Sequence, residues 1–450
     1  MNKTILASTL ALVFAAALGG CAVQPPVAPQ VATAMPKQWQ QFDAQAAEGA
    51  ASWVDDAQLA ALQAQALAAN RDIRQAALRM QRAQLQLQGA GLDRQPTPSL
   101  GLDASRSRLL EGGGRTQRSH GANVGLSYEL DLWQRLGAAE QAQAAQVESA
   151  RTDIAAAQAL IRAQVAERYW ALGALEQERP LVAEQLQAAE QVLLLTRQRV
   201  REGKLLPIEV DKVAATLQDL RARQAQLQRE QAQHRLALGL LLDQPEPALP
   251  AEPRLPATAP MRWQPAAPDQ ALAQRPDVQR ARAQVDAALA QQRGIEAARY
   301  PRLSLTAGVG TGGAAAKDWL RNPLGSLAAN LIVPLVDWRR LDLQRSQALT
   351  DVESAALSLR DTLHKALVEI EGLAAEEREL QAQSAANQAR LQEAEQTERL
   401  AQLRFEVGAI ARADWLQARN ARLAAEQQAL QLRLRAWVNQ QGLRKALAAG

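Results

Sequence analysis

The stretch WQRLGAAEQAQAAQVESA at residues 133–150 returns in altered form at residues 338–355, as WRRLDLQRSQALTDVESA. The offset is 205 residues (338 − 133), and the same offset leads from the motif RVREG to the motif RFEVG, at residues 199–203 and 404–408. Matches at one fixed offset continue upstream, where Asp72 meets Asp277. We therefore predict two copies of one unit, in about residues 67–240 and 272–445.

Long helices are predicted in each copy. From about residue 55 to residue 94, Ala, Gln, Leu and Arg continue without proline, which predicts one helix of up to about 40 residues. After residue 133 a helical pattern continues to the tip motif, and roughly 65 residues at ~1.5 Å each would make a rod of roughly 100 Å. Pro180 has no counterpart in the second copy, so a kink or break is predicted in the first copy only.

Apolar residues on both sides of Gly203 follow a heptad pattern. The predicted seam consists of Val182, Leu186, Ala189, Leu193, Thr196 and Val200 on one arm and of Leu206, Val210, Val213, Leu217 and Leu220 on the other. Such a seam predicts that the two arms pack as an antiparallel coiled coil, with the glycine at the reversal. The second hairpin keeps Gly408, but Asn387 and Glu398 occupy seam positions, which predicts poorer packing there.

Between the helices the apolar period changes to two, as in a β-strand. Strand pairs are predicted in residues 98–132 and 301–337, each with one apolar and one polar face. The expected fold class is mostly α with a membrane β-barrel, made of internally duplicated long helical hairpins plus four strands per chain. Four strands cannot close a barrel, so several chains would combine theirs, and three chains would supply twelve. Other multiples, and a strand pair packed on a soluble core, stay open as alternatives.

The N-terminus is predicted to be a lipoprotein signal peptide at residues 1–20. Its apolar run is shorter than the roughly 20 residues that a membrane-spanning helix requires. The run ends in LGGC at residues 18–21, which resembles the lipobox of bacterial lipoproteins, so Cys21 is the expected lipidation site. Ala22 follows rather than aspartate, which favours the outer membrane. An ordinary signal peptide is the alternative.

The remaining segments complete the expected domain order. A lipidated tether at residues 21–54 precedes the first copy, at residues 55–242. A proline-rich linker at residues 243–270 precedes the second copy, at residues 271–450. The helical hairpins of the two copies have their tips at Gly203 and Gly408.

Composition argues against several classes of function. The chain has 51 Lys and Arg against 47 Asp and Glu and no basic block, so we expect no nucleic-acid partner. His120, His234 and His364 lie in separate segments without the spacing of metal ligands, and no phosphate-binding loop is present. We therefore expect no catalytic residue, no metal and no cofactor, and we predict that the protein is not an enzyme.

Five motifs in order resemble the signatures of TolC-type outer-membrane efflux proteins, and most of all the lipoprotein branch that serves resistance-nodulation-division pumps. They are NRDI at residues 70–73, YELDLW at 128–133, RPDV at 275–278, YPRLSL at 300–305 and PLVD at 334–337. The resemblance implies a homotrimer with a 12-strand barrel in the outer-membrane lipid and a helical tunnel, an α-barrel, in the periplasm. It also implies docking to a periplasmic adaptor protein and an inner-membrane pump.

The resemblance also suggests site residues near the hairpin tips. Adaptor-docking positions map onto Arg199, Gly203, Lys204 and Leu205 in the first tip and onto Arg404, Gly408, Ala409 and Ile410 in the second. The family's periplasmic gate maps onto Glu209, Arg412 and Asp414. Gln417 stands where the family often has a second aspartate, so whether the gate has a single or a double acidic ring stays open. Solvated helix-surface charge is the alternative interpretation of the three gate residues.

The predicted function is a passive exit duct: the outer-membrane channel of a tripartite efflux system that releases small molecules to the exterior. Two alternatives stay open. One is a periplasmic coiled-coil adaptor lipoprotein, and the other is the outer-membrane duct of a type I protein secretion system. The sequence names neither the exported compounds nor the partner pump.

Overall fold

The computed structural model describes residues 36–42, 56–108, 116–245, 253–257, 265–313, 323–334 and 337–447. The predicted signal peptide, Cys21 and most of the tether lie outside these residues. So do the predicted loops between the paired strands and much of the proline-rich linker. The domain boundaries proposed for these segments stay predictions.

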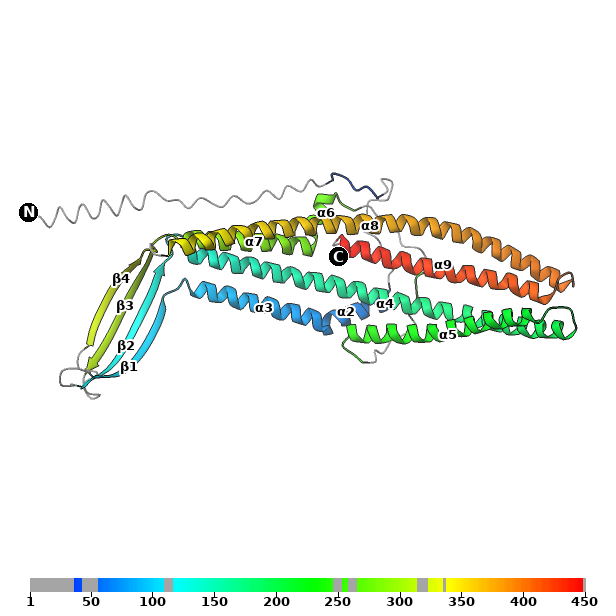
Figure 1. Cartoon of the computed structure of the whole chain (residues 1–450), viewed down its shortest axis with the longest axis horizontal. Coiled ribbons are helices and arrows are strands. Elements are labelled where there is room, and N and C mark those ends of the chain that lie inside the picture. Colours follow the sequence, from blue (N-terminus) through cyan, green and yellow to red (C-terminus); the bar gives the residue numbers. More distant parts are fainter. Residues whose placement is uncertain are drawn as a thin grey trace, which may run out of the picture. The chain divides into compact units, whose positions relative to one another are not determined.

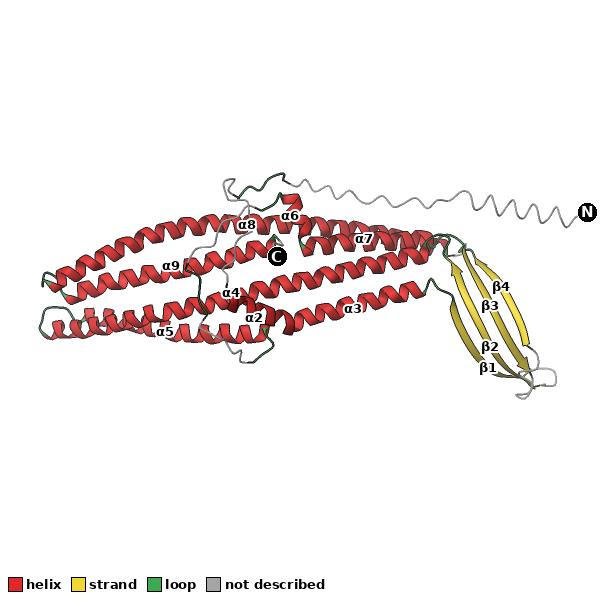
Figure 2. Cartoon of the chain, turned by 180° about the vertical axis from the view of Figure 1, so that it is seen from behind, coloured by secondary structure: helices red, strands yellow, loops and turns green. Residues whose placement is uncertain are grey.

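The same order of elements occurs twice along the chain (Figure 1). The first series is α2 (Ala57–Ala69), α3 (Arg71–Leu92), β1 (Thr97–Arg108), β2 (Thr116–Leu130), α4 (Arg135–Arg201) and α5 (Ile208–Leu241). The second is α6 (Pro268–Gln274), α7 (Pro276–Ala297), β3 (Arg302–Gly313), β4 (Pro323–Ile332), α8 (Trp338–Glu406) and α9 (Arg412–Ala446). The fold is thus mostly helical with one small sheet, as Figure 2 shows by colour.

The chain divides into two compact units. The strand unit contains all four strands and the adjoining helix ends, within Arg79–Arg151 and Arg280–Asp361. The hairpin unit contains the remaining helical parts, within Ala34–Leu78, Thr152–Gln279 and Thr362–Gly450. In the described residues, no helix has an apolar stretch of the length needed to cross a bilayer.

The first predicted helix is in fact two helices. α2 ends at Ala69, and Asn70 has an extended backbone with a ψ of 131°. The Asn70 side-chain oxygen accepts hydrogen bonds from the N–H groups of Asp72 (2.9 Å) and Ile73 (3.4 Å), and its amide donates to Leu241 O (3.1 Å). Asparagine is a strong N-cap because it satisfies free N–H groups at the start of a helix. The prediction of one helix from residue 55 to residue 94 is therefore wrong.

The predicted break at Pro180 is also wrong. α4 continues through Pro180 as one helix of 67 residues. Proline removes a single backbone hydrogen bond at an exposed position, where water can serve the freed carbonyl group. On either side, Leu172 and Val182 are each only 1% exposed, so packing holds the helix in register across the proline.

The four strands form one antiparallel sheet in the order β1-β2-β3-β4. The pairing of β2 with β3 joins the two copies, while β1 and β4 are the edges. The register places Pro98, Leu126, Ala307 and Leu327 in one row across the sheet, and Ser99, Gly125, Gly308 and Ser326 in the next row. Because successive side chains point to opposite faces, the sheet has an apolar face and a polar face.

The apolar face is uncovered within the described chain. Leu100 is 75% exposed, Leu102 is 72% exposed and Leu327 is 83% exposed. A strand pair packed on a soluble core would bury these side chains, so that alternative is wrong. β4 ends at Ile332, two residues before Pro334, which therefore lies beyond the strand.

Candidate functional site

Both hairpin tips use the same turn. Gly203 has a φ of 70° and Gly408 a φ of 74°. In the first tip the N–H of Lys204 donates to Arg199 O (2.8 Å), and in the second the N–H of Ala409 donates to Arg404 O (2.8 Å). These bonds, with a left-handed glycine between their ends, form the Schellman motif that ends many helices. The prediction that a glycine stands at each chain reversal is confirmed.

The predicted docking residues are gathered around these turns. Arg199, Lys204, Arg404 and Ala409 are exposed, while Leu205 and Ile410 are half-buried. Lys204 Nζ lies 2.8 Å from a carboxylate oxygen of Glu202. The hydrogen bonds that Glu202 accepts from Lys204 and Gln198 lower the pKa of its carboxyl group.

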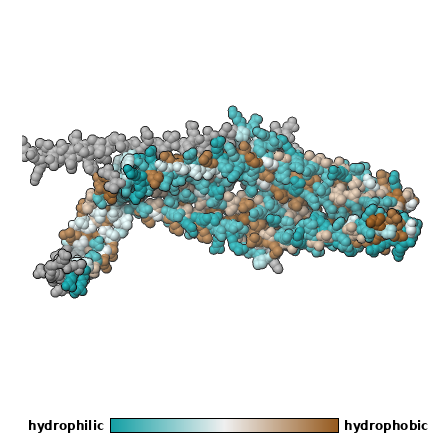
Figure 3. All heavy atoms as spheres, viewed as in Figure 1, coloured by the Kyte–Doolittle hydropathy of each residue, from teal (hydrophilic) through white to brown (hydrophobic). Residues whose placement is uncertain are grey.

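Three apolar side chains at the tips were missed or misassigned. Leu206 is 70% exposed, Ile208 52% and Val407 79%. Leu206 was predicted to be part of the seam, which is wrong because it lies in the turn before α5 begins at Ile208. Figure 3 shows hydrophobic residues among the charged ones at the hairpin ends. The signal in the sequence was an apolar residue within five positions of a tip glycine.

Two of the three predicted gate residues, Glu209 and Asp414, make local contacts within this chain. Glu209 accepts from Lys212 Nζ (2.8 Å) in the first turn of α5. Asp414 accepts from the backbone N–H of Ala411 (3.2 Å) in the first turn of α9. Carboxylates at these places stabilise helix N-termini, where the helix dipole is positive. Arg412 is exposed, and no ion pair joins it to Asp414 or Glu209 among the described residues.

The two hairpins differ in their seams. In the first, Ala189, Leu193 and Leu217 are buried together, and Leu186, Val210, Val213 and Leu220 pack against them. At the 205-residue offset, Leu193 and Leu217 correspond to Glu398 and Arg422, which form an ion pair. At these positions the second seam, for which poorer packing was predicted, has an ion pair in place of an apolar contact.

Arg422 is the centre of a polar cluster in the second hairpin. It pairs with Glu398 and Glu426, and its guanidinium lies 3.9 Å from Glu184 on α4. Burial lowers the pKa of Arg422, but the hydrogen bonds to the two partner carboxylates outweigh it, so the pKa is raised. The buried Asn387 donates to Ala425 O (3.0 Å), which satisfies the other polar seam residue.

Polar contacts also connect the first hairpin to the second. Arg419 on α9 donates to Glu184 on α4 at 3.1 Å, and Gln427 donates to Gln185 at 3.0 Å. The sequence did not predict this connection, because the partners lie more than 200 residues apart. It means that a movement of α9 against α4 would break charge-assisted hydrogen bonds.

A second ionic group, in this case around a buried arginine, lies at the RPDV motif. Arg275 is 7% exposed and donates to Asp277 Oδ1 (3.0 Å), to Glu369 on α8 (2.8 Å) and to Ala446 O on α9 (2.6 Å). Although burial raises the pKa of Asp277, the hydrogen bond from Arg275 lowers it below its usual range. This motif therefore ties α6 and α7 to the last helix of the chain.

The strand unit carries an aromatic group where the strands meet the helices. Trp133 and Tyr300 stack with ring centroids 4.8 Å apart, and Trp133 Nε1 donates to Pro301 O (2.9 Å). The Arg299 guanidinium lies 4.4 Å from the ring of Trp338. Tryptophan and tyrosine favour the boundary between lipid and water. Trp133 follows the end of β2, and Tyr300 precedes the start of β3.

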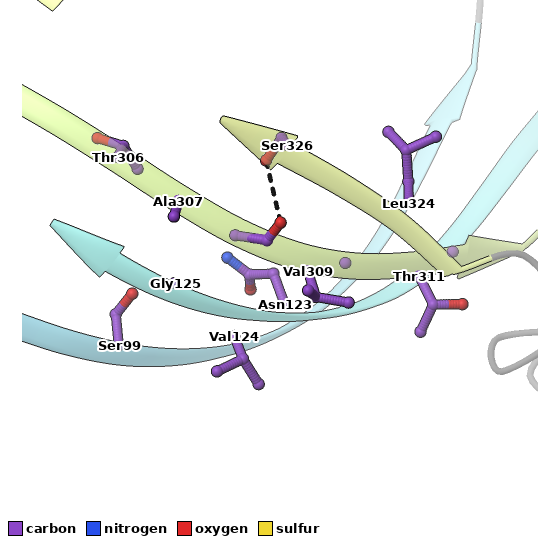
Figure 4. Close-up of a pocket in the computed structure, with 13 residues that line it drawn as sticks. Ser99, Asn123, Val124, Gly125, Thr306, Ala307, Val309, Thr311, Leu324 and Ser326 are labelled. Atoms are coloured by element: carbon purple, nitrogen blue, oxygen red, sulfur yellow. Dashed lines mark hydrogen bonds between the residues drawn. The ribbon is translucent and has the colours of Figure 1, made fainter. Parts of the chain in front are cut away.

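The polar face of the sheet is built from small residues. Figure 4 shows Ser99, Asn123 and Ser326 around a hollow on this face, while Val124 points away from it. Ser326 Oγ donates to Gly308 O (3.3 Å), the bond that is dashed in the picture. Such a face suits contact with water rather than a bound organic ligand.

The described residues contain no group of three His, Cys, Asp or Glu side chains that could hold a metal ion. His120 lies on β2, His234 on α5 and His364 on α8. His234 Nδ1 lies 3.3 Å from Arg168, and burial lowers its pKa, with the Arg168 charge acting in the same direction.

The sequence profile of the outer membrane efflux protein family matches the chain twice, over residues 62–243 and 267–449. A probable efflux pump outer membrane protein of Pseudomonas putida, TtgC, is 31% identical over 488 residues, which cover 100% of this chain and 96% of that protein. The pyoverdine export outer membrane protein OpmQ of Pseudomonas aeruginosa is 29% identical over 413 residues, which cover 87% of this chain and 85% of OpmQ.

Solved structures show the same fold. The outer membrane channel MtrE of Neisseria gonorrhoeae, in its open state, superimposes with a TM-score of 0.78 at 23% identity. The superposition covers 92% of this chain and 97% of MtrE. The outer membrane protein VceC of Vibrio cholerae gives a TM-score of 0.76 at 24% identity, over 87% and 96% of the two chains.

Proposed function

Since this chain belongs to the outer membrane efflux protein family, we propose that three chains assemble into the passive outer-membrane duct of a tripartite pump. The observation that carries the proposal is the four-stranded sheet with two free edges and an exposed apolar face. An open edge is not tolerated in lipid, because its backbone groups would lack hydrogen-bond partners. In a ring of three chains, pairing β1 of one chain with β4 of the next removes every edge and gives twelve strands.

The alternatives are less well supported. A periplasmic adaptor is surrounded by water, which does not favour a sheet with a large uncovered apolar face. The type I secretion duct is not favoured, because the relatives are named for efflux or export of small molecules and ions. Pyoverdine, toluene, antibiotics and cations all appear in those names. We infer that a common duct serves different pumps and that the pump selects the substrate.

The assembly is tested by native mass and by conductance. We expect the purified protein in detergent to have the mass of a trimer and to give channels in planar bilayers. A monodisperse monomer without conductance would contradict the proposal. A Cys21→Ala variant tests the lipid anchor, and we expect it to lose its lipid and fractionate less completely with outer membranes.

We further propose that the two tips receive a periplasmic adaptor, which itself contacts an inner-membrane pump. Support comes from the exposed apolar residues Leu206, Ile208 and Val407 beside exposed Arg199, Lys204 and Arg404. Apolar side chains surrounded by charged ones are typical of a protein–protein contact. Gly203→Ala would strain this turn, whereas Val407→Ser would remove only apolar area, so loss of adaptor binding in both variants supports a contact at the tips.

We propose that Glu209, Arg412 and Asp414 of all three chains form the gate. Because Asp414 also caps α9, its charge and its cap need separate tests. Asp414→Asn keeps an oxygen acceptor and removes the charge, whereas Asp414→Ala removes both. We expect single-channel conductance to rise in both variants and in Arg412→Ala. An increase in Asp414→Ala alone would point to the cap, and unchanged conductance in all three would exclude the gate role.

A further inference from the structure

The apolar face of the sheet ends in a cluster of arginines. Along β2 this face carries Leu130, Tyr128, Leu126, Val124, Ala122 and His120, followed by Arg118. Arg106 lies directly opposite Arg118 in the register, and Arg108 follows on the same face of β1. All three arginines are exposed, and none forms an ion pair with another described residue. We call these three residues the arginine cluster.

The spacing of these residues matches the thickness of a membrane. From Leu130 to His120 the strand advances about 33 Å at roughly 3.3 Å per residue. A strand tilt of about 40° reduces this to about 25 Å, the usual height of the apolar band of an outer-membrane barrel. Arg118 is two residues farther along. The arginine cluster therefore stands just past the apolar band, at the depth of lipid headgroups.

The opposite end of the band fixes its direction. Trp133 and Tyr300 stack at the end where the strands join the helices, which the proposed function places on the periplasmic side. The arginine cluster then faces the outer leaflet. Arginine is costly at the centre of a bilayer, and this cost nearly vanishes at the interface.

Charge complementarity decides the kind of partner. Arginines directly opposite each other repel, so this arrangement is unfavourable unless an anion lies between them. The only carboxylates in the described strands, Asp103 and Glu129, fall in the rows of the polar face. Guanidinium groups bind phosphate with two parallel hydrogen bonds. In the described residues, β3 ends at Gly313 and β4 begins at Pro323, so neither strand has an arginine at this end.

We propose that the arginine cluster of each chain binds a phosphate-bearing lipid headgroup of the outer leaflet. This inference rests on the proposed barrel. The lipid would neutralise the repulsion between Arg106 and Arg118, and it would hold the β1–β2 ribbon at a defined depth. The polar lumen and the hairpin tips play no part in it.

The test uses the full-length protein in detergent and three probes: diphosphoryl lipid A, the same glycolipid without phosphates, and inorganic phosphate. We expect only diphosphoryl lipid A to raise the temperature of heat denaturation, with a shift that weakens in high salt. In Arg106→Gln/Arg118→Gln we expect the apparent affinity for this lipid to fall about tenfold or more. In Arg106→Lys/Arg118→Lys the charge remains, so we expect a smaller loss.

Arg79→Gln/Arg82→Gln is the matched control, because it removes two exposed arginines from α3. Equal lipid affinity in the control and in the glutamine variant of the cluster would overturn the inference. So would equal stabilisation by the phosphate-free glycolipid, or binding of inorganic phosphate as tight as that of the lipid. Bilayer conductance is measured on the same samples. Absence of channels would contradict the proposed duct, whereas channels without lipid discrimination would contradict only this inference.

Discussion

The two helical hairpins have the same turns and nearly the same lengths of arm, but different interactions hold their arms together. At equivalent positions the first has Leu193 and Leu217, and the second has Glu398 and Arg422. Apolar packing is non-directional and insensitive to salt. The Glu398–Arg422 ion pair is half-buried, with 16% and 20% of the two side chains exposed, so each charge has lost much of its hydration and depends on its partner. The first hairpin is thus tolerant of small shifts, and the second is bound to one arrangement.

The largest effect is expected when a charge of the second hairpin's seam is placed in the seam of the first hairpin. Leu217→Arg places an unpaired guanidinium beside Leu193 and Ala189. We expect it to lower the free energy of unfolding by about 4 kcal/mol, the cost of an uncompensated buried charge. Thermal unfolding followed by circular dichroism measures the loss. The control is Gln218→Arg at the exposed neighbouring position. If both variants lose the same stability, the first seam is not a buried apolar contact.

The reverse exchange concerns the second hairpin. Arg422→Leu alone leaves Glu398 without its partner, and we expect a loss of about 2 kcal/mol, between the values for exposed and for fully buried pairs. Adding Glu398→Leu recreates the apolar pair of the first hairpin, so the double variant should recover most of that stability. Double-mutant analysis of the melting curves gives the coupling energy. Additive effects of the two substitutions would mean that the pair contributes no mutual stabilisation.

A smaller effect is expected where the hairpins are alike. Gly203→Ala and Gly408→Ala each place a side chain on a left-handed residue, which costs about 1 kcal/mol. No heavy atom lies within 4 Å of a Cβ built at either glycine, so only backbone strain contributes. The two variants should therefore lose equal stability in heat denaturation. A difference between them would show that the turns are not equivalent.

The smallest effect contrasts Asp277 with its counterpart Asp72. The pKa of Asp277 is lowered in the folded state, although burial raises it, because Arg275 donates hydrogen bonds to its carboxylate. Its stabilisation is thus complete above the pKa of an unfolded aspartate and is lost as pH falls through the lower folded pKa. We expect Asp277→Asn to lower the melting temperature slightly at pH 7 and to flatten its decline below about pH 4. Asp72 lacks such an arginine, because Asn70 stands where the second copy has Arg275. An unchanged acid limb of the melting profile in Asp277→Asn would refute the assignment.

Much of the fold could be predicted because its signals are local. The 205-residue offset, the alternation along the strands, the heptad spacing around Gly203 and both tip glycines are visible in short stretches. The residue roles at the tips could be assigned only by resemblance. Leu206 shows the limit of pattern: it has the right spacing for the seam, but it lies in the turn and is exposed.

Local patterns along the chain are therefore enough to specify two long hairpins and four two-faced strands, because periodicity depends on neighbours in the sequence. Tertiary structure alone decided that Asn70 separates two helices while Pro180 does not break one. It also decided that Arg422 is shared by Glu398 and Glu426, and that Arg419 reaches Glu184. These outcomes depend on burial and on partners distant in sequence, which no local period encodes. The arginine cluster depends on both kinds of information. Alternation along the strands predicts the face on which it lies, and only the strand register places Arg106 opposite Arg118.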